Sequence, residues 1–241
     1  MLKNILSDVY QDRIPLKILN LKIQETKVDC NQCYRASSKY KGPWPYKNNL
    51  KCCTFHPFLP NYLIGGILSD PQLKKAHAII ENKIKEGTHA LPVGIFAPLE
   101  YQKKFHLGDE TDFGQDETLL CPYYDKKNHL CSVWEYRGAV CTTFYCQSTY
   151  GRSGKVFWRK LRDYISYVEM ALMEESLIQR GFSPRDISAQ LEFLNYNFTE
   201  SKLHLKSKAD LKKYISEFWR TYEDPIEFYK KCYQIVKNTN S

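Results

Sequence analysis

The sequence predicts a mostly α-helical protein in which an irregular, cysteine-rich, metal-binding region packs with a C-terminal helical bundle. Two observations support this prediction. Eight of the nine cysteines lie before residue 150, in sequence that is interrupted by prolines and glycines. After that residue, apolar side chains recur every three or four positions between signals that start helices. We therefore expect a cysteine-cluster domain over residues 1–150, with its motif at 30–146, and a helical tail over 151–241 packed on it.

Composition and charge disfavour several classes of protein. The 241 residues carry a net charge of +8 and are 43% hydrophobic, which is typical of a globular domain. The positive excess is spread over the whole chain, whereas a nucleic-acid interface concentrates it, so a nucleic-acid partner is not expected. No apolar run reaches the roughly 18 residues of a membrane helix, and no membrane partner is expected. Met1–Tyr10 lack the apolar core of a signal peptide, which predicts a cytoplasmic location.

The first part of the chain is expected to contain little regular structure. Residues 1–29 contain short apolar runs, which predict a helix or a hairpin. Residues 30–66 include the segment Lys41–Pro45, and its two prolines oppose a helix and favour a turn. Irregular backbone of this kind is common around thiolates that bind a metal.

One helix is predicted in the middle of the chain. Asp70 can cap it, Pro71 suits its first position, and Gly87 suits its exit. Residues 88–120 contain several prolines and glycines and are predicted to be mostly loop, with a short strand within 91–97.

The tail is predicted to consist of four helices. The first runs over Val156–Arg180 and ends at Gly181, because its apolar residues keep a three-to-four spacing. The others open at Ser183, Ser207 and Asp224, which are N-cap residues with an acidic residue or a proline in the following turn.

The cysteines are the main functional signal. An odd number of cysteines and the missing signal peptide favour metal binding or catalysis over a disulfide framework. Cys30 and Cys33 are spaced so that one turn can present both sulfurs to the same ion, whereas adjacent cysteines normally point apart. Cys232 stands alone and is expected to pack as a small hydrophobic residue. The eight candidate metal ligands form two groups, which are Cys30, Cys33, Cys52 and Cys53, and then Cys121, Cys131, Cys141 and Cys146.

The later group resembles a known family. The runs Cys121-Pro-Tyr-Tyr, Cys131-Ser-Val-Trp-Glu-Tyr-Arg and Cys141-Thr-Thr-Phe-Tyr-Cys146 are similar to those of the YkgJ-type cysteine-cluster family, a zinc- or iron-chelating domain. The early pair and the adjacent cysteines take the family's early positions, and the resemblance covers residues 30–146. Gly138 stands where the family commonly has proline and Thr142 where it has arginine. The gap from Cys33 to Cys52 is also longer than usual.

The resemblance implies an iron–sulfur cluster or zinc. Thiolates suit both, but the irregular spacing and the lack of a zinc-finger pattern favour the cluster. The sequence does not divide the eight thiolates between one centre and two. Arg137 is expected to pair with Glu135 or to donate to a sulfur. Tyr124, Trp134 and Phe144 either shield the site from water or belong to the ordinary core.

Other candidate sites are weaker. Cys30 and Cys33 also have the spacing of a redox dithiol, but the segment before them is too polar for the buried strand that such a motif follows. His56 and His129 are near the cysteines and are expected to be ordinary hydrogen-bonded side chains rather than ligands. Gly151–Lys155 lacks the residues of a phosphate loop and is interpreted as a flexible link into the long helix.

These features predict a metal-binding protein whose metal has a structural, redox or sensory role. One alternative is a structural zinc module that presents the helical tail to a protein partner. The other is a cluster-dependent, methyltransferase-like enzyme that modifies proteins, because flagellin lysine methylation involves proteins with a similar cysteine-cluster region. The sequence does not decide whether the chain is an enzyme.

Overall fold

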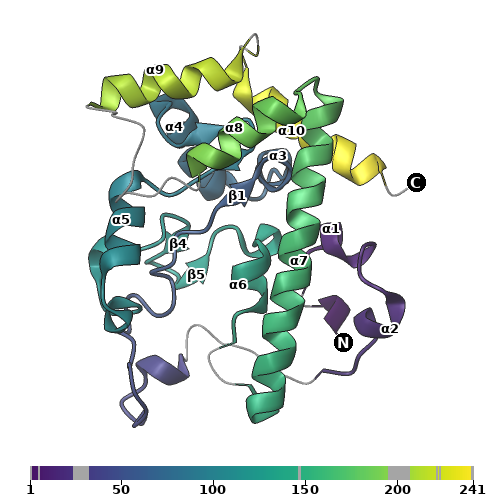
Figure 1. The fold of residues 1–241 in the computed structure, drawn as a ribbon. Coiled ribbons are helices and arrows are strands. Elements are labelled where there is room, and N and C mark those ends of the chain that lie inside the picture. Colours follow the sequence, from purple (N-terminus) through teal and green to yellow (C-terminus); the bar gives the residue numbers. More distant parts are fainter. Residues whose placement is uncertain are drawn as a thin grey trace. The chain divides into compact units, whose positions relative to one another are not determined.

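The structure is a computed structural model that is mostly helical (Figure 1), which confirms the predicted fold class at that level. Cys30 and Cys146 lie outside the described part of the chain. The described residues are 2–4, 6–23, 33–145, 148–194, 207–220, 222 and 224–239.

The elements are short before residue 150 and long after it. The strands are β1 (Leu59–Pro60), β2 (Ala90–Leu91), β3 (Gly94–Ile95), β4 (Tyr124–Asp125) and β5 (Leu130–Cys131). The helices are α1 (Asp8–Gln11), α2 (Leu16–Leu19), α3 (Asn61–Ser69), α4 (Lys74–Glu86), α5 (Leu99–Leu107), α6 (Ala139–Thr143), α7 (Gly151–Gln179), α8 (Pro184–Leu194), α9 (Lys208–Trp219) and α10 (Pro225–Asn238).

The chain forms two compact units, each made of two separate stretches of sequence. Unit 1 combines Met1–Pro57 with Lys104–Val168, and unit 2 combines Phe58–Lys103 with Glu169–Ser241. The first turns of α7 belong to unit 1 and its last turns to unit 2. The expected division after residue 150 therefore coincides with the start of α7 and not with a boundary between these units.

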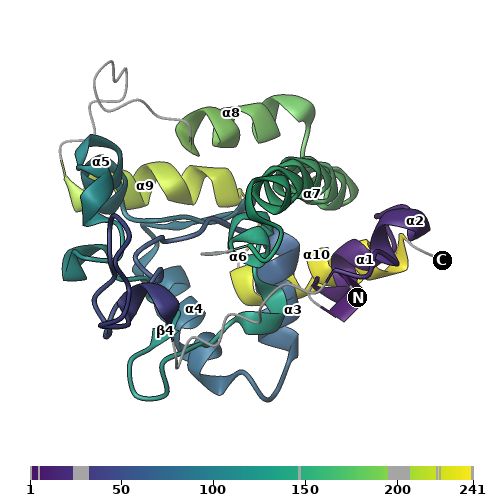
Figure 2. The same cartoon turned by 90° about the horizontal axis from the view of Figure 1, so that it is seen from below.

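Unit 1 is built around the first half of α7. Trp158, Leu161 and Ile165 are spaced three and four residues apart, so they share one helix face, and all three are buried. The short N-terminal helices α1 and α2 lie alongside this region (Figures 1 and 2). Their apolar residues join the same core, whose members are Leu2, Leu6, Tyr10, Ile14, Leu19, Ala139, Trp158, Leu161 and Ile165.

Unit 2 is centred on α3, a helix that is buried along almost its whole length and packs on α10. The approach is so close that a Cβ on Gly65 would lie 1.9 Å from the carbonyl oxygen of Tyr229. The hydroxyl of Tyr229 donates to the carbonyl of Leu91 at 2.7 Å, which ties α10 to a small antiparallel sheet of order β1-β3-β2. Glycine at position 65 is therefore required by the packing of two helices.

The middle of the chain differs from the prediction in four places. The buried helix α3 begins at Asn61, within residues 30–66, which the sequence predicts to be irregular. The helix expected from Pro71 begins at Lys74, and the Asp70 carboxylate accepts from the N–H of Gln72 instead of capping it. Its predicted end at Gly87 is correct, with φ at 66°. The expected strand within 91–97 is a pair of two-residue strands, β2 and β3, and the helix α5 occupies a segment predicted to be loop.

The helices of the tail follow the predicted start signals. Ser183 and Asp186 bond reciprocally at the start of α8, the Ser207 side chain caps α9, and Asp224 caps α10. The first helix begins earlier than predicted, at Gly151, so the expected flexible link is the first turn of α7. A Cβ on Gly154 would lie 1.8 Å from Ser148 Oγ, and glycine thus lets the preceding loop lie against the helix.

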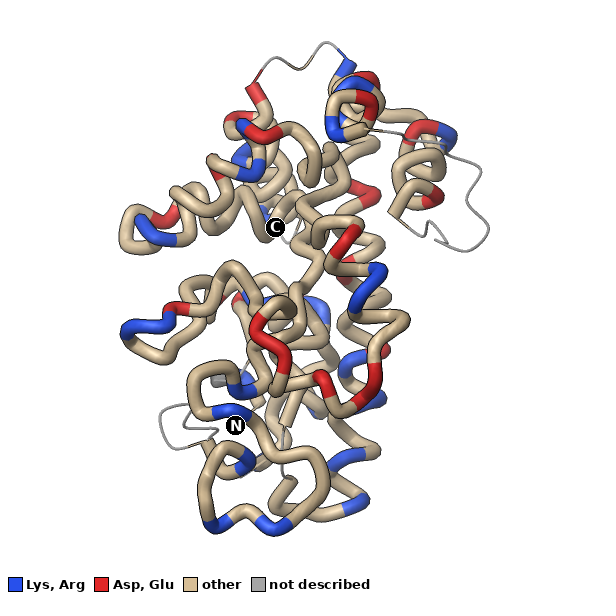
Figure 3. Tube along the Cα trace, turned by 90° about the vertical axis from the view of Figure 1, so that its left-hand side faces the viewer, with Lys and Arg blue, Asp and Glu red and all other residues tan. Residues whose placement is uncertain are grey.

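Charge is distributed as the sequence indicates. Lys and Arg occur along the described chain trace from one end to the other, whereas Asp and Glu gather in several runs (Figure 3). Among the described helices, none combines the length and apolar character needed to cross a membrane.

Candidate functional site

The first cysteine group lies in a segment of turns in unit 1. Cys33 is buried and immediately precedes a 3-10 turn over Tyr34–Ala36. Cys52 and Cys53 are partly buried and follow Lys51, whose φ of 57° marks a sharp reversal of the chain. The backbone at these described cysteines is irregular, as the sequence predicts.

The second group begins around the hairpin of β4 and β5. Tyr124 on β4 pairs with Cys131 on β5. At the tip, the Tyr124 hydroxyl lies 2.9 Å from His129 Nδ1, and the Asp125 carboxylate accepts from the N–H of Lys127 at 2.9 Å. These bonds hold the hairpin in shape and fix the position of Cys131. They also give His129 the ordinary hydrogen-bonded role that the sequence favours.

A backbone hydrogen bond brings the two cysteine groups together. The N–H of Cys121 donates to the carbonyl of Cys53 at 2.7 Å, although 68 residues separate them. Cys121 is also two residues before Tyr123, whose carbonyl accepts from both the N–H and the hydroxyl of Ser132, at 2.8 and 2.9 Å. Cys53, Cys121 and Cys131 are thus attached to one hydrogen-bonded segment of unit 1.

Tyr123 lies at the centre of this segment. Its side chain is 1% exposed, and its hydroxyl has no hydrogen-bond partner among the described residues. Burial raises the pKa of Tyr123 well above its usual value, and the charges of the Cys121 and Cys131 thiolates raise it further. The backbone places Tyr123 near both cysteines, because it is two residues from Cys121 and bonds to Ser132, the neighbour of Cys131. Across the ring, the His56 imidazole lies 6.0 Å away, and its Nδ1 contacts the carbonyl of Pro57 at 3.1 Å.

A buried hydroxyl without a partner is costly, and native proteins rarely leave one. An acceptor beside Cys121 and Cys131, such as a sulfur or an ordered water molecule, would satisfy it. Tyr123 stands within the predicted cysteine motif, but the sequence alone predicts no role for it. Its position two residues after Cys121 is the only sequence feature that points to it. Spacing does not reveal that the ring is buried or that its hydroxyl lacks a described hydrogen-bond partner.

Cys141 lies on α6, where Arg137 contacts its backbone. Arg137 Nη1 donates to the Cys141 carbonyl at 3.3 Å, and its Nε donates to the Trp134 carbonyl at 3.0 Å. The guanidinium also lies 3.5 Å from the centre of the Trp134 ring. The described contacts of Arg137 are therefore with carbonyls and an aromatic ring, whereas the sequence predicts a contact with Glu135 or with a sulfur.

The three aromatic residues expected to shield the site differ in exposure. Tyr124 is buried, whereas Trp134 is 42% and Phe144 39% exposed. The two exposed rings are therefore not part of the core.

Within the described residues, the cysteines do not form a complete metal site. Of the described cysteines in unit 1, Cys33 and Cys121 are the most buried. No set of three or more His, Cys, Asp or Glu side chains in the described part of the chain is placed to hold one ion. The backbone thus groups Cys53, Cys121 and Cys131, while their side chains do not converge on a point.

Cys232 is separate from this group, as expected. It is fully buried on α10 in unit 2, and burial raises the pKa of its thiol to about 12. The Ser176 side chain, which hydrogen-bonds to this sulfur, lowers that pKa in part.

No protein family, no curated protein and no solved structure matches the chain.

Proposed function

We propose that the chain is a metal-binding protein whose unit 1 cysteines hold an iron–sulfur cluster as thiolates. The observation that carries this proposal is the buried, unpartnered hydroxyl of Tyr123 beside Cys121 and Cys131, at the point where Cys53 joins the same segment. Three thiols and a free donor are the chemistry that a sulfur-bridged metal centre needs.

Each of these residues has a definite task in the proposal. Cys53, Cys121 and Cys131 supply thiolate ligands, and the remaining ligands come from the other cysteines of the two groups. The Tyr123 hydroxyl donates a hydrogen bond to a sulfur, which reduces the negative charge that the thiolates bring together. Arg137 holds the backbone of Cys141 through its carbonyl. A bound cluster would supply one-electron transfer, or an oxidation-sensitive signal.

Binding of the metal must draw the thiols together. Metal ligation commonly stabilises an arrangement of cysteines that the metal-free chain does not hold. The separation of the described sulfurs in this structure is therefore expected to close on metal binding.

Substitution of single cysteines tests the proposal in the full chain. Cys121→Ser and Cys131→Ser are expected to lose most of the metal that copurifies with the wild type, because each removes one thiolate. Cys232→Ser is the matched control and is expected to keep it, since Cys232 packs in unit 2. Metal is measured per chain, and circular dichroism shows whether the variants remain helical.

The outcome also separates the two metals. Iron with acid-labile sulfide supports the cluster, and zinc alone replaces it by a structural thiolate site. Equal metal content in the Cys121→Ser, Cys131→Ser and Cys232→Ser proteins would contradict both the cluster and the zinc site. The unit 1 cysteines named in the proposal would then hold no metal.

A further inference from the structure

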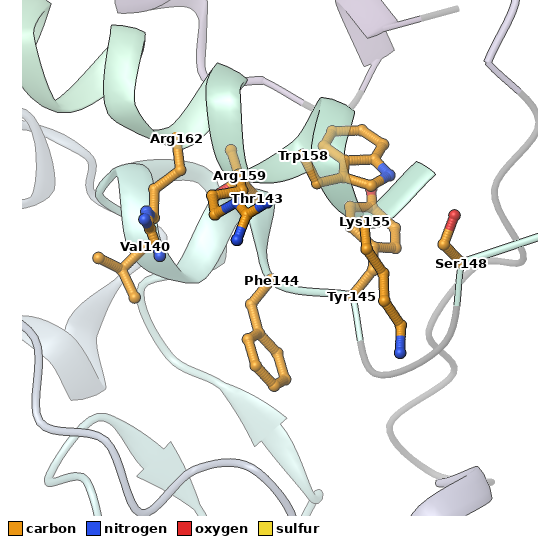
Figure 4. Close-up of a pocket in the computed structure, with 9 residues that line it drawn as sticks. All are labelled: Val140, Thr143, Phe144, Tyr145, Ser148, Lys155, Trp158, Arg159 and Arg162. Atoms are coloured by element: carbon orange, nitrogen blue, oxygen red, sulfur yellow. The ribbon is translucent and has the colours of Figure 1, made fainter. Parts of the chain in front are cut away.

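Unit 1 has an open pocket beside the first half of α7, and its lining includes Val140 and Thr143 of α6, the helix that carries Cys141. Its volume is about 160 Å³. Figure 4 shows Lys155, Arg159 and Arg162 projecting from α7 toward the side on which Phe144 lies, with Tyr145 and Trp158 at the helix. This volume is below the range of about 300–1,000 Å³ that encloses a whole drug-sized ligand, so the pocket suits one group of a larger molecule.

The pocket is positively charged because three basic side chains line it. Lys155, Arg159 and Arg162 are four and three residues apart, which places them on one face of α7. The lining contains these three cations and no carboxylate. Among the described residues, Lys155 and Arg159 have no ion-pair partner, and Arg162 contacts only its neighbour Asp163, at 2.8 Å. Three like charges on one face repel one another, so an anion between them would be stabilising.

The other wall of the pocket is aromatic and firmly supported. The rings of Tyr145 and Trp158 are stacked with their centres 4.2 Å apart, and Trp158 is 3% exposed. Phe144 also lines the pocket and is 39% exposed. A flat ring attached to a bound anion could therefore lie against Phe144 at the mouth of the pocket.

We propose that this pocket binds the phosphate group of a small phosphate monoester that carries a flat ring. Arginine binds phosphate through two parallel hydrogen bonds, and lysine adds a point charge. Arg159 and Lys155 hold the phosphate, Arg162 adds a third positive charge, and Phe144 packs on the ring outside. The proposal does not depend on a metal in the cysteine segment.

Calorimetric titration of the full chain tests the proposal, with adenosine monophosphate, inorganic phosphate and adenosine as the probes. We expect saturable binding of adenosine monophosphate at low salt, weaker binding of phosphate and none of adenosine. Arg159→Gln is expected to weaken binding about tenfold, since it removes a charge-assisted contact. Lys160→Gln removes an equally exposed charge from α7 outside the pocket and is expected to change the affinity less than about twofold.

Phe144→Ala distinguishes the contribution of the ligand's ring to binding from that of its phosphate. It is expected to weaken adenosine monophosphate binding and to leave phosphate binding unchanged. The proposal is overturned if no saturable binding occurs at millimolar probe, or if Lys160→Gln weakens binding as much as Arg159→Gln. Equal affinity for phosphate and for adenosine monophosphate would overturn the ring contact. Circular dichroism shows that each variant remains folded.

Discussion

His89 shows how one side chain can make stability depend on pH. It lies in unit 2 just before β2, where its Nδ1 is 2.9 Å from Thr88 Oγ1 and its ring packs 5.8 Å from Phe96. Burial, and then the charge of Lys83, lower its pKa from 6.5 to about 4. Of the other charges that act on it, Lys208 lowers the pKa further, and Glu86 raises it.

The sign of the effect follows from the lowered pKa. The folded protein favours the neutral imidazole, so this contribution to stability is fully present above pH 6.5 and is lost as the pH falls toward 4. We expect the free energy of unfolding in urea to fall over this interval, and His89→Gln to flatten the dependence. His106→Gln, which removes an exposed histidine, should leave the dependence unchanged. A wild-type pH dependence in the His89→Gln protein would contradict this explanation.

At the residue scale, the sequence predicts isolated side chains better than shared sites. The packing of Cys232 follows from its apolar neighbours on one helix face, and the structure confirms it. The contacts of Arg137 with two carbonyls depend on how the chain turns after Trp134, and no spacing rule contains that information. Tyr123 is missed for the same reason, because its lack of a partner is a property of the folded surroundings.

At the scale of elements, the helix starts of the tail are local and therefore predictable. Asp224 accepts from the N–H groups of Ile226 at 2.9 Å and Glu227 at 3.2 Å, and Pro225 occupies the first helical position. Such a cap needs only four consecutive residues. The helix α5 is missed because the prolines and glycines around it favour a loop, although Pro98, Glu100 and Gly108 are also signals of a helix start and end. The expected cap at Asp70 fails because its carboxylate stabilises a turn.

Removing the cap of α10 should destabilise unit 2. Asp224→Ala is expected to lower the free energy of unfolding by about 1 kcal/mol, because two backbone N–H groups lose their acceptor. Asp224→Asn keeps an acceptor oxygen and is expected to restore most of that loss. Urea unfolding measures both. Equal destabilisation by alanine and asparagine would show that the negative charge, and not the hydrogen bond, is the source of the effect.

The contact of α3 with α10 allows a second test at this scale. Gly65→Ala places a methyl group 1.9 Å from the carbonyl oxygen of Tyr229, so the two helices must separate. We expect a loss of about 3 kcal/mol in unfolding free energy, at the upper end of ordinary overpacking. Lys85→Ala on the exposed face of α4 is the control and should change stability little. A neutral Gly65→Ala would mean that these helices are not in contact as described.

At the scale of the whole molecule, the sequence predicts the fold class but not which stretches of chain pack together. The mostly helical fold class follows from the apolar periodicity after residue 150. The two units are each assembled from separate stretches of chain, with α7 running through the boundary. Such an arrangement depends on long-range contacts, for example the backbone hydrogen bond from the N–H of Cys121 to the carbonyl of Cys53. Local sequence patterns do not encode contacts of this kind.

The candidate site, too, is only partly predictable from the sequence. The two cysteine groups are visible in the sequence, and the resemblance to a cysteine-cluster family rests on them. The hydrogen bond that joins the groups and the buried Tyr123 hydroxyl appear only in the fold. Together they support a thiolate metal centre in unit 1, which is the central proposal.

The most direct test is the content of iron, zinc and acid-labile sulfide, with a visible spectrum, in the full chain purified without air. The proposal predicts a brown protein with iron, sulfide and absorbance in the blue, all of which decline together on exposure to air. Stoichiometric zinc in a colourless protein would contradict the iron–sulfur assignment and leave a structural thiolate site. A protein with neither metal, whose thiols oxidise readily to disulfides, would contradict metal binding altogether.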